Sequence, residues 1–154
     1  MRPTTLPCEL FSPPEPTGKL VVVLHGRGDS SKGFHWMPRA LGLPGVSYLL
    51  VNAPDPWYGG RSWYGLPPDH LPGVLRSREL LDRLFDELVA QGQAPRDTVL
   101  FGFSQGCLLT LEWGGRTALP LAGCAGASGY VASPDALVEA LADAARARPW
   151  LITH

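Results

Sequence analysis

A serine flanked by glycines stands where a strand-like run meets a helix-like run, in Gly102-Phe103-Ser104-Gln105-Gly106. A serine hydroxyl becomes a working nucleophile when a base takes its proton and fixed donors stabilise the oxyanion that forms. A sharp turn from strand to helix exposes that hydroxyl, but it brings the backbone so close that small residues are needed two positions before and after. Gly102 and Gly106 meet this need. The pattern therefore predicts Ser104 as a nucleophile, the alternative being a tight turn whose serine only caps the helix.

A second glycine-rich segment, Gly26-Arg27-Gly28-Asp29, follows an earlier strand-like run. In this kind of site one oxyanion donor is the amide of the residue after the nucleophile, here Gln105, and the other comes from such a loop. Gly26 and Gly28 let the backbone fold back, so that the amide of Arg27 can point into the site. We expect the backbone amides of Arg27 and Gln105 to form the oxyanion hole.

Other titratable residues near these segments are given structural roles. His25 ends a strand-like run beside the loop, and we expect its side chain to fix the loop by a hydrogen bond rather than to transfer a proton. Asp29 is expected to cap the following turn rather than to serve as a triad acid. His35 and His70 are interpreted as surface or loop residues rather than bases.

Aromatic residues concentrate in the long connection between residues 53 and 72. Connections of this length in compact domains are usually functional, and ligand sites are largely apolar and aromatic. We therefore expect Trp57, Trp63 and Tyr64, with Tyr58, to line a substrate pocket. The alternative is that they only pack beneath the loop.

Strand-like and helix-like runs alternate along the chain. Strands are expected at 19–25, 46–52, 97–103, 119–129 and 149–154, and helices at 34–42, from 74 to a stop at Gly92, at 105–113 and at 134–146. This alternation predicts an α/β fold with a mostly parallel sheet covered by helices on both faces. Ligands of such sheets bind beyond the carboxyl ends of the strands, where both glycine-rich segments fall.

Composition bounds the class of protein. The 154 residues suit one domain, 1–154, and 45% apolar with 18% charged residues is typical of a globular chain. A formal charge of −1 gives no electrostatic reason to expect nucleic acid or an anionic membrane as a partner. The first residues lack the apolar core of a signal peptide, which favours a cytoplasmic protein. Cys8, Cys107 and Cys124 are odd in number and are interpreted as reduced thiols, the last two in the core. No metal or other cofactor is expected.

Three segments carry a resemblance to a known family: "VVVLHGRGD", "VNAPDPWYGGRSWYGL" and "LFGFSQGCLLTL". In this order they resemble the phospholipase/carboxylesterase family of α/β-hydrolases, which includes carboxylesterases and acyl-protein thioesterases. The resemblance implies a serine hydrolase acting on a small-molecule ester or thioester, with Ser104 as nucleophile. It also implies that residues 61–66 border the acyl site, with Trp63 at the family's aromatic position. Because the family more often has an apolar residue at position 27, we hypothesise that Arg27 tunes preference for substrate charge.

The resemblance also bears on the rest of the triad, in which the acid and then the histidine follow the serine along the chain. "PWLITH" matches the strand that precedes the family's acid loop, so His154 is not expected to be the base. We expect the acid, the base, one or two strands and a helix to be missing. Loss of the base costs about a million-fold in turnover, so this chain is expected to be nearly inactive alone. The one substitute pair within it would be Asp135 with His70.

Three alternatives stay open at this point. The chain could be a catalytically inactive relative that binds acyl groups or small ligands. It could be an enzyme similar to dienelactone hydrolases, although those have cysteine at the position of Ser104. It could also form a homodimer in which a second chain completes the site.

Overall fold

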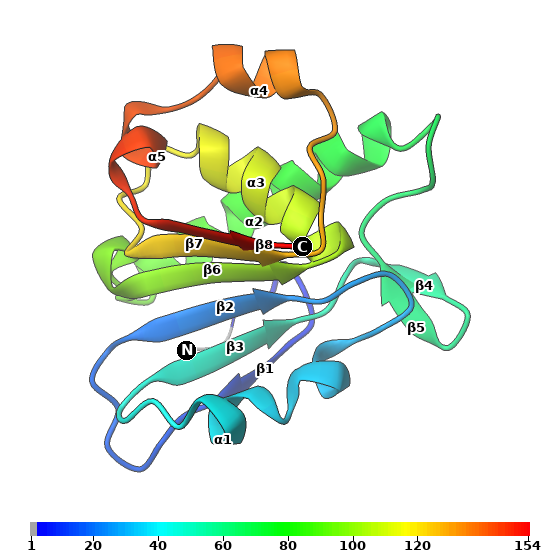
Figure 1. Ribbon diagram of the computed structural model, residues 1–154. Helices are drawn as coiled ribbons and strands as arrows, with labels where there is room; N and C mark the ends of the chain where they lie inside the picture. The colour runs from blue at the N-terminus through cyan, green and yellow to red at the C-terminus, as the bar shows by residue number, and fades with distance from the viewer. Residues whose placement is uncertain (1–2) are drawn as a thin grey trace.

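The computed structural model describes residues 3–154, which form a central six-stranded sheet and a separate two-stranded hairpin (Figure 1). The strands are β1 (Cys8–Phe11), β2 (Leu20–Leu24), β3 (Ser47–Val51), β4 (Asp55–Trp57), β5 (Gly60–Ser62), β6 (Thr98–Phe103), β7 (Gly123–Ala127) and β8 (Trp150–Thr153). The α-helices are α1 (Met37–Leu41), α2 (Leu71–Ala90), α3 (Gln105–Arg116), α4 (Pro134–Glu139) and α5 (Asp143–Ala147), and the 3-10 helices are η1 (Ser31–Phe34) and η2 (Pro95–Asp97). The strands expected at 19–25, 46–52, 97–103, 119–129 and 149–154 correspond to β2, β3, β6, β7 and β8.

The order of strands in the central sheet is β1-β3-β2-β6-β7-β8. Strands β2, β3, β6, β7 and β8 are parallel, and only β1 pairs antiparallel, with β3. The chain passes from β2 to β3 on one side and then crosses by α2 to β6 on the other side of β2. This reversal places the ends of β2 and β6 next to each other, with Leu24 opposite Gly102. In an open parallel sheet, the crevice at such a point is where ligands bind.

Helices cover both faces of the sheet (Figure 1). On one face, α2 and α3 pack against the apolar side chains of the strands, because α2 repeats buried residues at helical spacing. These residues are Val74, Ser77, Leu81, Leu84, Phe85 and Leu88. On the other face, Phe34 and Met37 of η1 and α1 pack against Val23 and Leu50 in a smaller cluster. The prediction of a mostly parallel sheet between two helical layers is confirmed.

Three local predictions were incomplete or wrong. Strand β1 was not expected, because "CELF" is short and its partner β3 lies about forty positions further on. The connection from 53 to 72 contains the hairpin β4–β5 and the first residues of α2. The single helix expected at 134–146 is two short helices, because the chain leaves helical geometry at Ala142, which is extended with φ −68° and ψ 148°.

Candidate active site

Ser104 occupies the single residue between the end of β6 and the start of α3. Its backbone has φ 53° and ψ −112°, outside the regions that residues other than glycine normally adopt. The amide of Ser104 donates a hydrogen bond to the carbonyl oxygen of Ala127, at 2.9 Å, and the side chain is half-buried. Residues in such strained conformations persist only where the surrounding structure holds them, and they cluster at functional sites. The turn therefore has the geometry of a nucleophile elbow.

Close approach of the backbone explains the two glycines around Ser104. A Cβ atom on Gly102 would collide with the backbone carbonyl group of Gly106, and one on Gly106 would collide with the carbonyl of Leu24 in β2. Larger side chains would therefore push α3 away from β6 and β2. The requirement for small residues at these two positions, inferred from the sequence, has its physical cause here.

The loop after β2 lies directly against Ser104. A Cβ atom on Gly26 would stand 3.2 Å from the Cβ of Ser104, so the loop leaves little room for a side chain at position 26. The loop is tied to β5: the amide of Gly28 donates to the carbonyl of Arg61 at 2.8 Å, and the amide of Arg61 donates to the carbonyl of Asp29 at 2.9 Å. Gly28 has φ 79°, which favours glycine. These contacts hold Arg27 at the rim of the turn that bears Ser104.

The predicted oxyanion donors are placed on two different elements. Gln105 is the first residue of α3, so its amide has no carbonyl of the preceding turn to bind and is free for an incoming oxygen. Arg27 lies in the loop that contacts Ser104 from the other side. The arrangement is compatible with our prediction that both amides face the developing negative charge, which stays a prediction.

The side chain of Gln105 has a role that the sequence did not reveal. Its Oε1 accepts hydrogen bonds from the amide of Trp63 (3.0 Å) and the hydroxyl of Ser62 (3.2 Å). Its Nε2 donates to the carbonyl of Tyr64 at 2.7 Å. The residue after the nucleophile therefore fastens the segment 62–64 to the start of α3.

His25 is buried, and both its ring nitrogens are engaged. Nε2 accepts a hydrogen bond from the amide of Ala53 at 3.0 Å, which leaves Nδ1 to donate to the carbonyl of Gly26 at 2.5 Å. Burial lowers the pKa of this imidazole below its ordinary value, so the ring is neutral. These contacts are compatible with the expected loop-fixing role of His25, which stays a prediction, and they leave neither nitrogen free to take a proton from Ser104.

The four aromatic residues predicted to line a substrate pocket differ in position. Trp63 is fully buried, and its indole N–H donates to the carbonyl of His25 at 2.9 Å. It therefore has no surface for a substrate and instead positions the end of β2. Tyr64 is also buried, with only 2% of its surface exposed, whereas Trp57 is half-buried and Tyr58 is almost fully exposed. Of the predicted set, Trp57 and Tyr58 reach the surface, and Trp57 lies beside Arg27.

The remaining titratable residues do not gather around Ser104. Within residues 3–154, no hydrogen bond joins the Ser104 hydroxyl to a histidine. His35 binds Glu9 at 3.0 Å, and His154 is exposed just beyond the end of β8. Asp135 lies exposed in the first turn of α4. The same described residues contain no group of histidine, cysteine and acidic side chains that could hold a metal ion.

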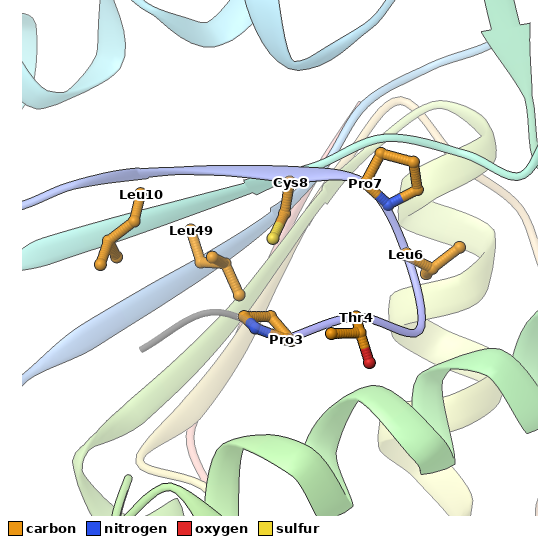
Figure 2. Close-up of a pocket in the computed structure, with 7 residues that line it drawn as sticks. All are labelled: Pro3, Thr4, Leu6, Pro7, Cys8, Leu10 and Leu49. Atoms are coloured by element: carbon orange, nitrogen blue, oxygen red, sulfur yellow. The ribbon is translucent and has the colours of Figure 1, made fainter.

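A cavity of about 650 Å³ opens at the β1 edge of the sheet (Figure 2). Its walls are formed by Pro3, Thr4, Leu6, Pro7, Cys8, Leu10 and Leu49. The hydroxyls of Thr4 and Thr5 donate to the carboxylate of Glu87 on α2, which holds the N-terminal wall and lowers the pKa of Glu87 to about 2. None of these residues belongs to the predicted active site.

Comparisons with known proteins agree with the fold. The sequence profile described as Phospholipase/Carboxylesterase matches residues 8–154. Acyl-protein thioesterase 1 of Schizosaccharomyces pombe is 32% identical over 148 residues, covering 87% of this chain and 66% of that protein. The crystal structure of esterase PE8 superposes with a TM-score of 0.80 at 29% identity, covering 96% of this chain and 73% of the other. Arabidopsis thaliana SOBER1 gives 0.78 at 25% identity, covering 88% and 73%.

The mostly parallel sheet, the covering helices and these structural neighbours define an α/β-hydrolase fold. The chain belongs to the phospholipase/carboxylesterase family. It spans about two thirds of the length of curated relatives that it matches. In residues 3–154, no helix has the length and apolar character needed to cross a bilayer.

Proposed function

We propose that this protein is a serine hydrolase that cleaves carboxylic ester or thioester bonds through an acyl intermediate on Ser104. The observation that carries the proposal is the strained backbone of Ser104 at the junction of β6 and α3, with the Gly26–Asp29 loop packed against it. The relatives named as acyl-protein thioesterases and esterases support the same reaction class. The three cysteines are free, which supports a site of action in the reducing cytoplasm.

In the proposed reaction, the Ser104 hydroxyl oxygen attacks the carbonyl carbon of the substrate while its proton passes to a base. The carbonyl oxygen becomes negatively charged, and the amides of Arg27 and Gln105 donate hydrogen bonds to it. Collapse of this intermediate breaks the bond to the alcohol or thiol, which leaves with a proton. Water then attacks the acyl-serine in the same way and releases the carboxylic acid.

The base is the part of this reaction that the described residues do not place. His25 uses both nitrogens elsewhere, and no histidine in residues 3–154 binds the Ser104 hydroxyl. We therefore propose that the 154-residue chain by itself hydrolyses esters at close to the background rate. The same observation favours a second candidate function, a catalytically inactive protein that binds acyl groups.

Labelling with a fluorophosphonate, read by intact mass, tests the proposal because the reagent needs an activated serine. Imidazole is added in increasing concentration as a base from solution. We expect slow labelling of one site without imidazole and faster labelling with it, none in Ser104→Ala, and no change in Ser133→Ala. Labelling that persists in Ser104→Ala would refute the nucleophile.

Two other labelling results would distinguish an active hydrolase from an inactive acyl-binding protein. Fast labelling without imidazole would support the nucleophile and contradict the low activity proposed for this chain. Absence of labelling at every imidazole concentration would favour the inactive acyl-binding protein.

A further inference from the structure

The side chain of Arg27 lies at the rim of the Ser104 turn without a negatively charged partner. Its guanidinium carbon is 5.5 Å from the centre of the Trp57 ring, so the planar group rests on an aromatic face. Its Nε is buried and makes no hydrogen bond in the described chain, and no carboxylate within residues 3–154 forms an ion pair with it. A buried donor without a partner is costly, which indicates a group that awaits one.

The charged residues nearest to Arg27 do not compensate it. The carboxylate of Asp29 accepts the amide of Ser30 at 2.8 Å and packs closely over Gly33. Arg61, on β5, donates its guanidinium to the carbonyls of Ala53 and Pro54 (3.0 Å for the latter) and brings no negative charge. The rim beside Ser104 therefore has an excess of positive charge.

The Tyr64 hydroxyl is a second buried polar group without a hydrogen-bond partner in the described chain. Burial raises the pKa of this hydroxyl, Tyr130 raises it further, and the positive charge of Arg27 opposes both effects. Because only 2% of Tyr64 is exposed, its hydroxyl has no surface for a ligand. Arg27 itself is only half-buried, so a ligand site here rests on Arg27 alone.

We propose that Arg27 is a subsite for an anionic group of the substrate. The substrate class is an ester or thioester that carries a carboxylate a few bonds from the reacting carbonyl, such as the monoester of a short dicarboxylic acid. An arginine that rests on an aromatic ring loses little freedom when it binds a carboxylate with two parallel hydrogen bonds. This inference rests on the proposed function for the position of the carbonyl, but binding itself needs no reaction.

Binding of two matched probes tests the subsite without turnover. Monomethyl succinate is anionic and dimethyl succinate is neutral, with the same carbon skeleton. Each is titrated against the native chain while the indole N–H resonance of Trp57, assigned with Trp57→Phe, is followed by NMR. We expect the anionic ester to bind about tenfold more tightly, because hydrogen bonds to charged groups are the strong ones.

Three variants test whether Arg27 causes the preference for the anionic ester. In Arg27→Met, which keeps the apolar stem, the ratio of the two dissociation constants should fall to about one. Arg27→Lys should keep part of the ratio, because lysine keeps the positive charge but cannot donate two parallel hydrogen bonds to one carboxylate. Arg96→Met removes an arginine whose side chain is 82% exposed at the opposite end of β6, and the ratio should stay native.

The outcomes that overturn the subsite are equal affinities in the native chain or a native ratio in Arg27→Met. Should Arg27→Met fail to fold, the ratio in the native chain must still decline as ionic strength rises, and a ratio independent of salt also overturns the proposal. A charge preference without fluorophosphonate labelling would retain the subsite and reject the hydrolase. Labelling without a charge preference would support the hydrolase and reject the subsite.

Discussion

The backbone around Ser104 and the segment after β7 differ in how tightly their surroundings define them. Around Ser104, Gly102 and Gly106 leave no room for a Cβ atom, and the buried side chain of Gln105 binds three groups of a distant loop. After β7, helix α4 has no buried residue, and Leu151 and Ile152 of β8 are 65% and 51% exposed. The nucleophile turn is thus specified by β2, β5, β6, β7 and α3, and it depends little on the elements that follow.

Of the substitutions that distinguish the two regions, that of Gly106 should lower the free energy of unfolding the most. In Gly106→Ala the new methyl group would meet the backbone carbonyl of Leu24, which cannot move without displacing β2. We expect the free energy of unfolding in urea to fall by about 3 kcal/mol. Val138→Ala, at a position 65% exposed on α4, should change it by less than about 0.5 kcal/mol. Equal losses of unfolding free energy in Gly106→Ala and Val138→Ala would contradict the difference in packing between the Ser104 turn and α4.

Removal of the Gln105 side chain should have the next largest effect. Gln105→Ala leaves the amide of Trp63 and the carbonyl of Tyr64 without these partners in a buried site, which should cost about 2 kcal/mol of unfolding free energy. Imidazole-dependent labelling of Ser104 should also slow, because the segment 62–64 is released.

Gln93 offers a matched control for Gln105. It is similarly buried, and its Nε2 donates to Gly18 (2.9 Å) and to Thr98 (3.1 Å) at the other end of the sheet. Gln93→Ala should lose comparable stability yet keep native labelling of Ser104. Equal labelling in the two variants would show that the Gln105 side chain does not position the site.

His25 should make the stability of the nucleophile end depend on pH. Its pKa in the folded chain is lowered from 6.5 by burial, so the unfolded chain takes up a proton first as the pH falls. The contribution of neutral His25 to the free energy of unfolding is therefore complete above pH 6.5. It declines as the pH falls from there through the folded pKa, by at most about 1.4 kcal/mol per pH unit. Urea unfolding across this range should show a shallower pH dependence in His25→Asn than in the exposed control His154→Asn. An identical pH dependence of unfolding in the two variants would show that His25 does not cause it.

Substitution on β8 should have the smallest effect on stability. Ile152→Lys replaces an exposed apolar side chain, so the unfolding free energy should change by less than about 0.5 kcal/mol. A lysine on an exposed edge strand should instead weaken self-association, which light scattering over a concentration series measures. Leu66→Lys, at an exposed loop position outside the sheet, is the control. Unchanged self-association in Ile152→Lys would show that this edge is not a pairing surface.

The parts of the fold that the sequence predicts are those with local signals. The aliphatic run 19–25 becomes β2, and the glycines around Ser104 identify the turn, because strand propensity and close backbone approach both depend on neighbouring residues. Strand β1 was missed because its pairing with β3 is a long-range contact. The hairpin β4–β5 was missed because Pro56 and the adjacent aromatics do not alternate as a strand does.

Within the candidate site, long-range contacts were likewise the part that the sequence did not show. Gln105 was chosen for its backbone amide, whereas its side chain binds residues more than forty positions away. Trp63 was expected at the substrate surface from its motif, but motif membership does not tell a buried supporting residue from a contacting one.

The left-handed backbone of Ser104 sets stability and chemistry against each other at one position. Holding a residue other than glycine there costs about 1–3 kcal/mol, and glycine would remove most of that cost together with the hydroxyl. A library of variants selected for heat resistance alone should therefore enrich glycine at position 104. Selection that also demands a reactive hydroxyl has to find its stability elsewhere, and the exposed side chains of α4 and β8 are where the chain has most to gain.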